Sequence, residues 1–184
     1  MVVNRRLFSA FAALLLVPAL LPAGASAHGP TRQKVTESVE IAAPPAKVWA
    51  KIKEFGDMSW HPDVASTNAA PGNVVKTTRL VVLKNGGELT QELYKYDDAK
   101  MTVSTLLPQV DVKVLPVNNY SDTITVKPGK TPESSLVEWR SAFYRGYPNN
   151  DPPPELNEEA AIKAVTAFTL SGLGGLKTAV ESGS

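Results

Sequence analysis

The chain has 184 residues, a formal net charge of +1 at neutral pH and no cysteine. The lack of cysteine excludes disulfides, thiolate metal sites and cysteine nucleophiles, so the fold must be stabilised by its core. The charge is nearly balanced and no lysine-arginine cluster stands out. This argues against nucleic acid and against an anionic membrane surface as partners.

The first 27 residues have the pattern of a secretory signal peptide. Arg5 and Arg6 precede an apolar run over residues 7–21, and the small residues 25–27 form a cleavage site. The run is shorter than the roughly 20 residues that span a bilayer. We therefore expect a periplasmic protein, cleaved after Ala27, with no membrane insertion afterwards. The two arginines also resemble the core of a twin-arginine signal, which leaves the export route open.

The remaining chain has the length of one domain. Residues 28–34 are polar and contain Gly-Pro, which predicts a flexible arm, and the folded domain is expected over residues 35–182. Residues 35–41 alternate between polar and apolar side chains and predict a first strand. Pro44 and Pro45 end this strand and open a short amphipathic helix, predicted over residues 45–55.

Between residues 74 and 144 the apolar side chains recur at every second position, which predicts an antiparallel meander. The sequence Asn-Gly-Gly at residues 85–87 favours a hairpin turn, because glycine accepts positive φ at little cost. The expected strands lie at 78–82, 89–96, 101–107, 120–126 and 137–144, with a further short one at 112–114.

A long helix is predicted at the end of the chain, with Asn157 as its N-cap. Its apolar face has helical spacing and consists of Ala161, Val165, Phe168, Gly172, Leu176 and Val180. Gly172, Gly174 and Gly175 weaken a helix, so we expect them to allow close approach to the sheet or to leave room for a ligand. The predicted fold class is α+β: a curved antiparallel sheet wrapped around the C-terminal helix, with a short helix after the first strand and a cavity between sheet and helix.

Four segments resemble the START-like helix-grip superfamily (SRPBCC, which includes polyketide cyclase-type proteins). They are residues 41–49, 60–62, 137–139 and 172–177, and the order of elements agrees with them. The export signal, the start HGPT at 28–31 and the proline-rich region 144–154 further resemble the periplasmic methanol-oxidation accessory proteins of the MxaD type. This resemblance implies a non-catalytic protein that assists electron transfer between a quinoprotein methanol dehydrogenase and its cytochrome c. It supplies no catalytic residues.

Ten residues are candidates for a ligand pocket because they are aromatic, charged or small and lie on the predicted helices, strands and adjoining loops. They are Trp49, Trp60, His61, Arg79, Tyr94, Glu138, Trp139, Arg140, Tyr144 and Gly172. Core packing is the alternative for the tryptophans, and a solvated ion pair is the alternative for the three charged residues. His61 is either a pocket residue that changes charge near neutral pH or a structural loop residue.

Three classes of function follow. The first is the accessory protein, docking through a surface around residues 148–154. The second is a carrier of a small hydrophobic ligand in the helix-grip cavity. The third is a cyclase-type enzyme, which requires a polar pair such as His61 with Glu138 or Arg140. The sequence contains no haem or cluster motif, and His28 with His61 is too small a set to predict a copper site, so no cofactor and no metal are expected.

Overall fold

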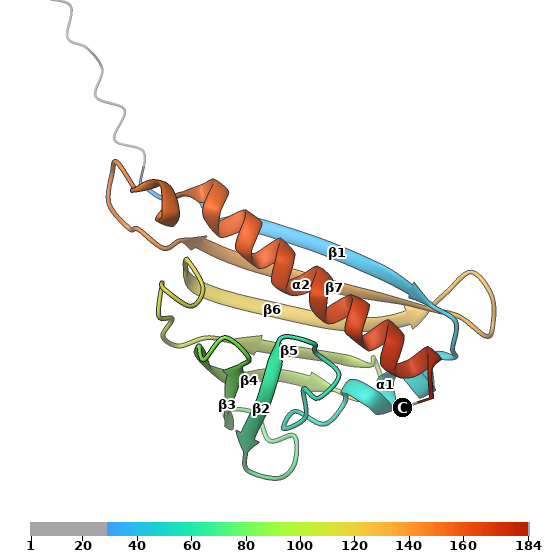
Figure 1. Cartoon of the computed structure of the whole chain (residues 1–184). Coiled ribbons are helices and arrows are strands. Elements are labelled where there is room, and N and C mark those ends of the chain that lie inside the picture. Colours follow the sequence, from blue (N-terminus) through green and yellow to red (C-terminus); the bar gives the residue numbers. More distant parts are fainter. Residues whose placement is uncertain (1–28, 184) are drawn as a thin grey trace, which may run out of the picture.

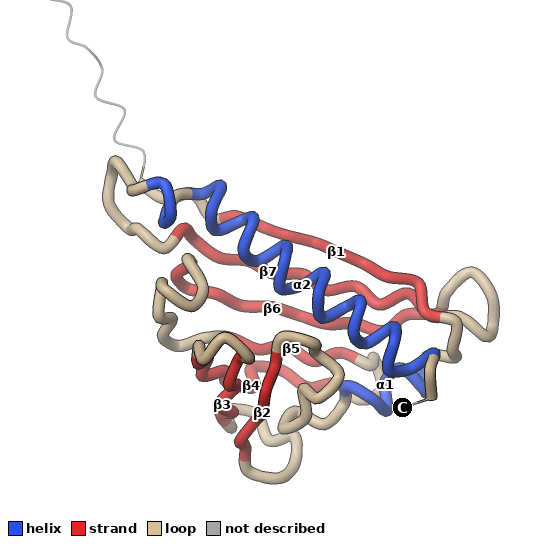
Figure 2. Tube along the Cα trace, viewed as in Figure 1, coloured by secondary structure: helices blue, strands red, loops and turns tan. Residues whose placement is uncertain are grey.

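The computed structural model describes residues 29–183, so the predicted signal peptide lies outside the described residues. A single curved sheet of seven antiparallel strands supports the long helix α2, which crosses its concave face (Figure 1 and Figure 2). The elements in chain order are β1 (Gln33–Ile41), α1 (Pro45–Ile52), β2 (Val64–Ala69), β3 (Thr78–Leu83), β4 (Glu88–Asp97), β5 (Thr102–Leu106), β6 (Val117–Pro128), β7 (Ser135–Arg145), the 3-10 turn η1 (Pro154–Leu156) and α2 (Glu158–Glu181). The expected α+β helix-grip architecture is confirmed.

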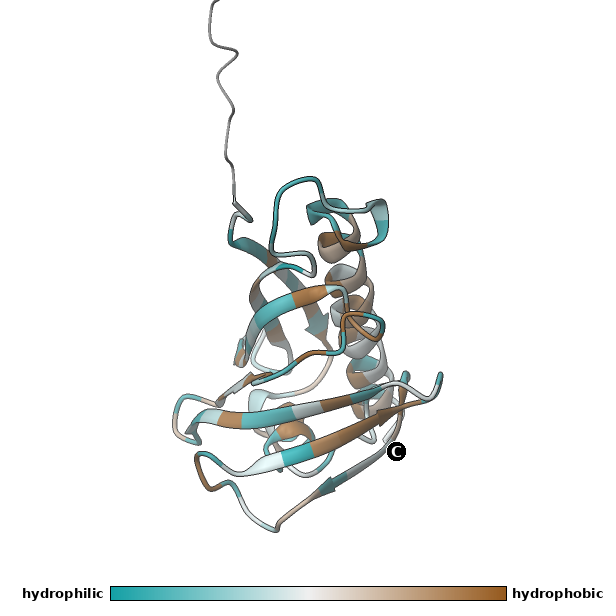
Figure 3. Ribbon diagram, turned by 90° about the vertical axis from the view of Figure 1, so that its left-hand side faces the viewer, coloured by the Kyte–Doolittle hydropathy of each residue, from teal (hydrophilic) through white to brown (hydrophobic). Residues whose placement is uncertain are grey.

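The strands follow one another across the sheet in the order β1-β7-β6-β5-β4-β3-β2. Every neighbouring pair is antiparallel. Strand β1 forms one edge of the sheet and pairs with β7, with Gln33 opposite Phe143 and Ile41 opposite Ser135. Hydrophobic and hydrophilic residues alternate along the strands (Figure 3). Strand β1 thus begins at Gln33, inside the segment expected to be an arm.

The strands differ from the prediction in two places. Residues 112–114 form no strand, because Asp111 bends the chain there: its carbonyl accepts from the amide of Val114 at 2.9 Å and its carboxylate accepts from the amide of Lys113. Strand β2 was not predicted. It is an edge strand in which only Val64 is buried, so it lacks the apolar alternation that marks a half-buried strand.

Helix α1 ends at Ile52, three residues earlier than expected. The amide of Phe55 donates to Oδ1 of Asn73 at 2.8 Å, and the carbonyl of Phe55 accepts from Arg79. Because both backbone groups of Phe55 bind other segments, the chain leaves the helix and turns into the interior.

The segment after α1 fills the space between the sheet and α2. Four large side chains from this segment are at most 5% exposed: Phe55, Met58, Trp60 and His61. They leave an enclosed space of only about 20 Å³ among the residues the structure describes. The expectation that nothing else in the chain fills the space between sheet and helix was therefore wrong, since it overlooked a loop rich in large side chains.

Helix α2 agrees with the prediction. The side chain of Asn157 caps it by accepting from the amide of Ala160 at 2.8 Å. Gly172 and Gly175 face the interior at close range, whereas a Cβ on Gly174 would meet nothing within 4 Å. In the described part of the chain, no helix is both long and apolar enough to cross a membrane.

Candidate functional site: an apolar groove beside the C-terminal helix

An open groove of about 340 Å³ lies between α2, the β3–β4 hairpin and the loop before β6. Most of its lining is apolar. The lining residues are Asp63, Leu83, Lys84, Asn85, Leu89, Val114, Leu115, Ala164, Ala167 and Phe168.

The predicted Asn-Gly-Gly turn forms and shapes one wall of the groove. Gly86 has φ of +85°, and Oδ1 of Asn85 accepts from the amide of Gly87 at 2.9 Å. Gly87 also lies against Val114: a Cβ at position 87 would stand 2.7 Å from Cγ1 of that side chain. The missing side chain lets the loop before β6 pack directly on the hairpin, so two walls of the groove are held together.

The inner side of the groove is aromatic. The ring of Phe168 stacks on the imidazole of His61, with centroids 4.2 Å apart and an interplanar angle of 29°. The imidazole also contacts Trp60 and Trp139, at centroid distances of 5.8 and 6.1 Å. Phe168 therefore separates the groove from the packed aromatic core.

His61 is buried, and both ring nitrogens have backbone partners. Nε2 lies 3.2 Å from the carbonyl oxygen of Phe168, and Nδ1 accepts from the amide of Asp63 at 3.2 Å. A carbonyl can only accept, so the proton of the neutral ring sits on Nε2. Burial lowers the pKa of His61 to about 4, although Asp63 and the Phe168 carbonyl oppose this. The side chain is neutral at physiological pH and is not a free base.

The interior beyond the aromatic layer contains a polar site around Arg79. Its Nε donates to Oε1 of Gln91 at 2.7 Å, its Nη1 donates to the carbonyl of Phe55, and its guanidinium lies 4.6 Å from the centroid of the Phe55 ring. Burial lowers the pKa of Arg79 to about 10, against the attraction of Asp122 and Asp57. Arg79 is therefore still cationic at neutral pH.

Asp122 is the second charged group of this interior site. Its Oδ1 accepts from the hydroxyl of Thr105 at 2.6 Å, and its Oδ2 accepts from Tyr120 and from Nε1 of Trp139, each at 3.1 Å. Burial raises the pKa of Asp122, whereas these three hydrogen bonds and Arg79 lower it. Our sequence reading missed Asp122. Asp122 lies two residues from both Tyr120 and Ile124, and this period of two places all three on the inward face of β6.

The ten predicted pocket residues divide between the two faces of the sheet. Six lie on the concave, helix-covered side: Trp49, Trp60, His61, Arg79, Trp139 and Gly172. Four lie on the outer face: Tyr94, Glu138, Arg140 and Tyr144. The structure therefore does not bring the ten together as one pocket.

The outer-face residues interact with one another and with solvent. Glu138 forms ion pairs of 3.1 Å with Lys127 on the neighbouring strand β6 and with Arg140 on its own strand β7. The solvated ion pair considered as the alternative for Glu138 and Arg140 therefore forms. Tyr144 lies under the guanidinium of Arg32, at 5.6 Å. Because Glu138 and Arg140 are on the face opposite His61, the two pairs named as examples for a cyclase-type site, His61 with Glu138 and His61 with Arg140, do not form.

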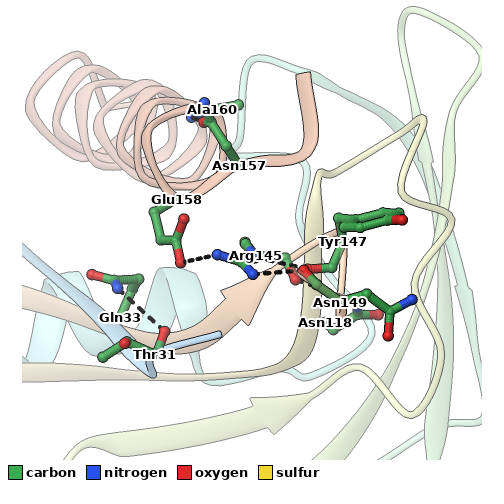
Figure 4. Close-up of polar contacts among 9 residues, drawn as sticks. All are labelled: Thr31, Gln33, Asn118, Arg145, Tyr147, Asn149, Asn157, Glu158 and Ala160. Carbon is green, nitrogen blue, oxygen red and sulfur yellow. Dashed lines mark hydrogen bonds and ion pairs between the residues drawn. The ribbon is translucent and has the colours of Figure 1, made fainter. Parts of the chain in front are cut away.

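Arg145 orders the proline-rich loop that precedes α2 (Figure 4). Its Nε donates to the carbonyl of Tyr147 at 2.8 Å, its Nη2 to the carbonyl of Asn149 at 2.7 Å, and its Nη1 pairs with Glu158 at 2.5 Å. Nδ2 of Asn118 on β6 donates to the carbonyl of Gly146 at 2.6 Å. The start of the loop is thus fixed to both the sheet and the first turn of α2.

No group of three potential metal ligands among histidine, cysteine, aspartate and glutamate occurs within residues 29–183.

The fold and the packed interior define a helix-grip protein. Residues 32–181 match the family model described as polyketide cyclase / dehydrase and lipid transport, and the chain belongs to this family. The resemblance seen in the sequence is thereby confirmed at the level of the superfamily. Among curated proteins, no match to this chain was found.

Solved structures support the same assignment. An uncharacterised protein from Bacillus thuringiensis is 27% identical, with a TM-score of 0.68, over 80% of this chain and 98% of that one. The protein XoxI from Bacillus cereus is 28% identical, with a TM-score of 0.67, over 80% and 94%. Norcoclaurine synthase from Thalictrum flavum is 15% identical, with a TM-score of 0.62, over 83% and 96%, which shows a shared fold alone.

Proposed function

We propose that this chain is a non-catalytic binding protein that holds a small apolar molecule in the groove over Phe168. The observation that carries the proposal is the groove itself: about 340 Å³, lined mainly by leucine, valine, alanine and phenylalanine. Pockets for small ligands have volumes of roughly 300–1,000 Å³ and are mostly apolar with a few polar groups. The family description, which includes lipid transport, supports the same class of function.

The lining also indicates the shape of the ligand. Phe168 offers a ring to one side of the groove, and Lys84 and Asn85 are on the hairpin. A flat apolar molecule with one polar end fits this arrangement, because its body contacts the apolar lining while its polar end reaches the ammonium or the amide. Burial of its surface contributes about 25 cal/mol per Å².

His61 and Asp122, two buried titratable groups of the interior, are not placed to act on a ligand in the groove. General acid-base chemistry needs a titratable group within reach of the substrate. Both nitrogens of His61 are engaged with backbone groups, and Asp122 is held by three side chains next to a space of only about 20 Å³. These groups lie behind the aromatic layer and not in the groove.

The test is a titration with 2-naphthol, followed by the NMR signals of the methyl groups of Leu89, Val114 and Leu115. Ala167 lines the groove, whereas Leu170 is exposed on α2 but does not line it. We expect Ala167→Phe to weaken binding at least about tenfold, which corresponds to roughly 1.4 kcal/mol, and Leu170→Phe to leave it unchanged. Equal binding by the two variants, or no methyl shifts in the wild type, would overturn the proposal.

A second candidate is the accessory role, in which the chain docks on a quinoprotein methanol dehydrogenase and its cytochrome c. The observation that favours it is the loop held by Arg145, where Pro148, Asn149 and Asn150 are exposed on a fixed backbone. A pre-ordered surface loses little conformational entropy on binding. A protein that contacts both partners raises their effective concentration without a redox group of its own.

This second candidate is tested by the rate at which methanol dehydrogenase from the same cell reduces its cytochrome c. We expect the wild-type protein to raise the rate, Asn150→Arg to abolish the increase, and Thr131→Arg, in the loop before β7, to retain it. An unchanged rate with the wild-type protein would exclude the accessory role and leave the ligand-binding proposal untouched.

We also propose that the protein acts in the periplasm after cleavage behind Ala27. The apolar run over residues 7–21 and the small residues 25–27 support this. Protein recovered from a periplasmic extract is expected to have a mass that begins at His28. Recovery of the full-length chain from the cytoplasm alone would contradict it.

A further inference from the structure

Two buried side chains of opposite charge line the same enclosed space. Arg79 is 8% exposed and Asp122 is 6% exposed, and both border the space of about 20 Å³ behind the aromatic layer. Within residues 29–183 no ion pair or hydrogen bond joins them directly: Arg79 binds Gln91 and Phe55, and Asp122 binds Thr105, Tyr120 and Trp139. The attraction between the two charges therefore acts across the space.

Both groups have hydrogen-bonding capacity left. A carboxylate has roughly four acceptor positions and a guanidinium about five N–H donors. Asp122 accepts three hydrogen bonds, two at Oδ2 and one at Oδ1, so a position remains at Oδ1. Arg79 donates from Nε and Nη1, so the donors of Nη2 remain without an acceptor among the described residues.

The space has the size of one water molecule. A cavity needs about 10–15 Å³ to hold a water, which also needs two to four polar partners. The space of about 20 Å³ satisfies the first condition for one water, and the polar groups of Arg79, Asp122 and Thr105 satisfy the second. The rest of the lining is apolar or aromatic: Ile52, Phe55, Met58, Trp60, Val103, Ile124 and Trp139.

We propose that this space is a built binding site for one water molecule, which accepts a hydrogen bond from Arg79 and donates one to Asp122. Water is the ligand that fits both neighbours, because it can accept and donate at once. An anion of this size would be repelled by the carboxylate and a cation by the guanidinium. The water turns two separated buried charges into a bridged pair and completes the network around Asp122.

The site has a consequence for binding specificity. Trp139 borders the water site and makes an edge contact with Phe168, which lines the outer groove, at a centroid distance of 6.0 Å. The space behind this aromatic layer is about 20 Å³, the size of one water, whereas the groove is about 340 Å³. A ligand larger than a water therefore has no room behind the layer and stays in the outer groove. The water site itself does not depend on any ligand.

The experiment is oxygen-17 magnetic relaxation dispersion, which counts long-lived water oxygens and is insensitive to exchanging hydroxyl hydrogens. The double variant Arg79→Met with Asp122→Leu removes both charges together, because a single change would strand the other charge in the interior. We expect the wild-type protein to show one more long-lived water than the double variant. The conservative Asp122→Asn, which keeps an acceptor, is expected to retain it.

Equal dispersion amplitudes for the wild type and a folded double variant would overturn the site. If the double variant does not fold, a crystal structure of the wild type decides the matter. Density for one water within hydrogen-bonding distance of both Arg79 and Asp122 supports the site. A direct contact between the two side chains, or an empty space between them, overturns it.

Discussion

Gly172 of α2 lies directly against the imidazole of His61. A Cβ atom at position 172 would stand 2.7 Å from Cδ2 of that ring and 2.6 Å from Cζ3 of Trp139. Real Cβ atoms essentially never approach other heavy atoms this closely. The missing side chain is what lets α2 rest on the aromatic core, and the close approach predicted for this glycine is confirmed.

In the variant Gly172→Ala the new methyl group overpacks two rings, which costs about 1–3 kcal/mol. Alanine regains roughly 1 kcal/mol over glycine in a helix, so the free energy of unfolding is expected to fall by up to about 2 kcal/mol. Gly174→Ala is the matched control. It lies on the same helix with open space around it and should stabilise by up to about 1 kcal/mol. Denaturant unfolding measures both, and equal effects of the two variants would contradict the packing argument.

The protein should lose stability as the pH falls from 6.5 towards 4. Burial lowers the pKa of His61 from 6.5 to about 4, so in this range the unfolded state binds a proton that the folded state does not. Stability is therefore full above pH 6.5 and falls by about 3 kcal/mol at most on approaching pH 4. The His61→Gln variant lacks this proton uptake and should show a flatter profile. Parallel profiles of the two proteins would show that His61 does not titrate in this way.

Thr169 is a further residue for which the structure predicts a gain in stability. It is fully buried on α2, and its hydroxyl oxygen has no hydrogen-bond partner among the described residues. Thr169→Val keeps the shape and removes an unsatisfied polar atom, so the free energy of unfolding should rise by about 1 kcal/mol. Thr169→Ser, which keeps the hydroxyl and loses a methyl group, should be less stable than the wild type. A destabilised valine variant would indicate a hydrogen bond to Thr169.

Arg145 should control the order of the loop before α2. Its guanidinium is buried and holds the carbonyls of Tyr147 and Asn149 together with the carboxylate of Glu158. In Arg145→Met these groups lose their donors, so the amide of Tyr147, which donates to the carbonyl of Leu156, should exchange its hydrogen faster. Amides in the centre of β6 serve as the internal reference. Unchanged exchange at Tyr147 would mean that the turn η1 holds the loop without Arg145.

The sequence predicted those parts of the fold whose side chains repeat with a regular period or mark a turn. The bounds of α2, its cap at Asn157 and the hairpin at Gly86 all follow from such local signals. Edge strand β2 was missed because only Val64 of its residues is buried. Helix α1 was predicted too long, since the partners that end it, Asn73 and Arg79, are distant in sequence.

The site was harder to predict because it depends on how elements pack. Alternation along β7 shows that Trp139 and Arg140 face opposite ways, but it does not show which face α2 covers. The filling of the interior by Phe55, Met58 and His61 arises from an irregular loop without any period. The groove is likewise lined by four segments far apart in the chain, and no local pattern brings them together.

The most direct test of the binding proposal is native mass spectrometry of the protein isolated from its own cells, with Ala167→Phe and Leu170→Phe prepared in the same way. We expect a small-molecule adduct on the wild type and on Leu170→Phe. The adduct should be lost from Ala167→Phe, because the new phenylalanine ring occupies the groove. A wild-type protein that carries no adduct, or an adduct that persists on Ala167→Phe, would contradict the binding proposal.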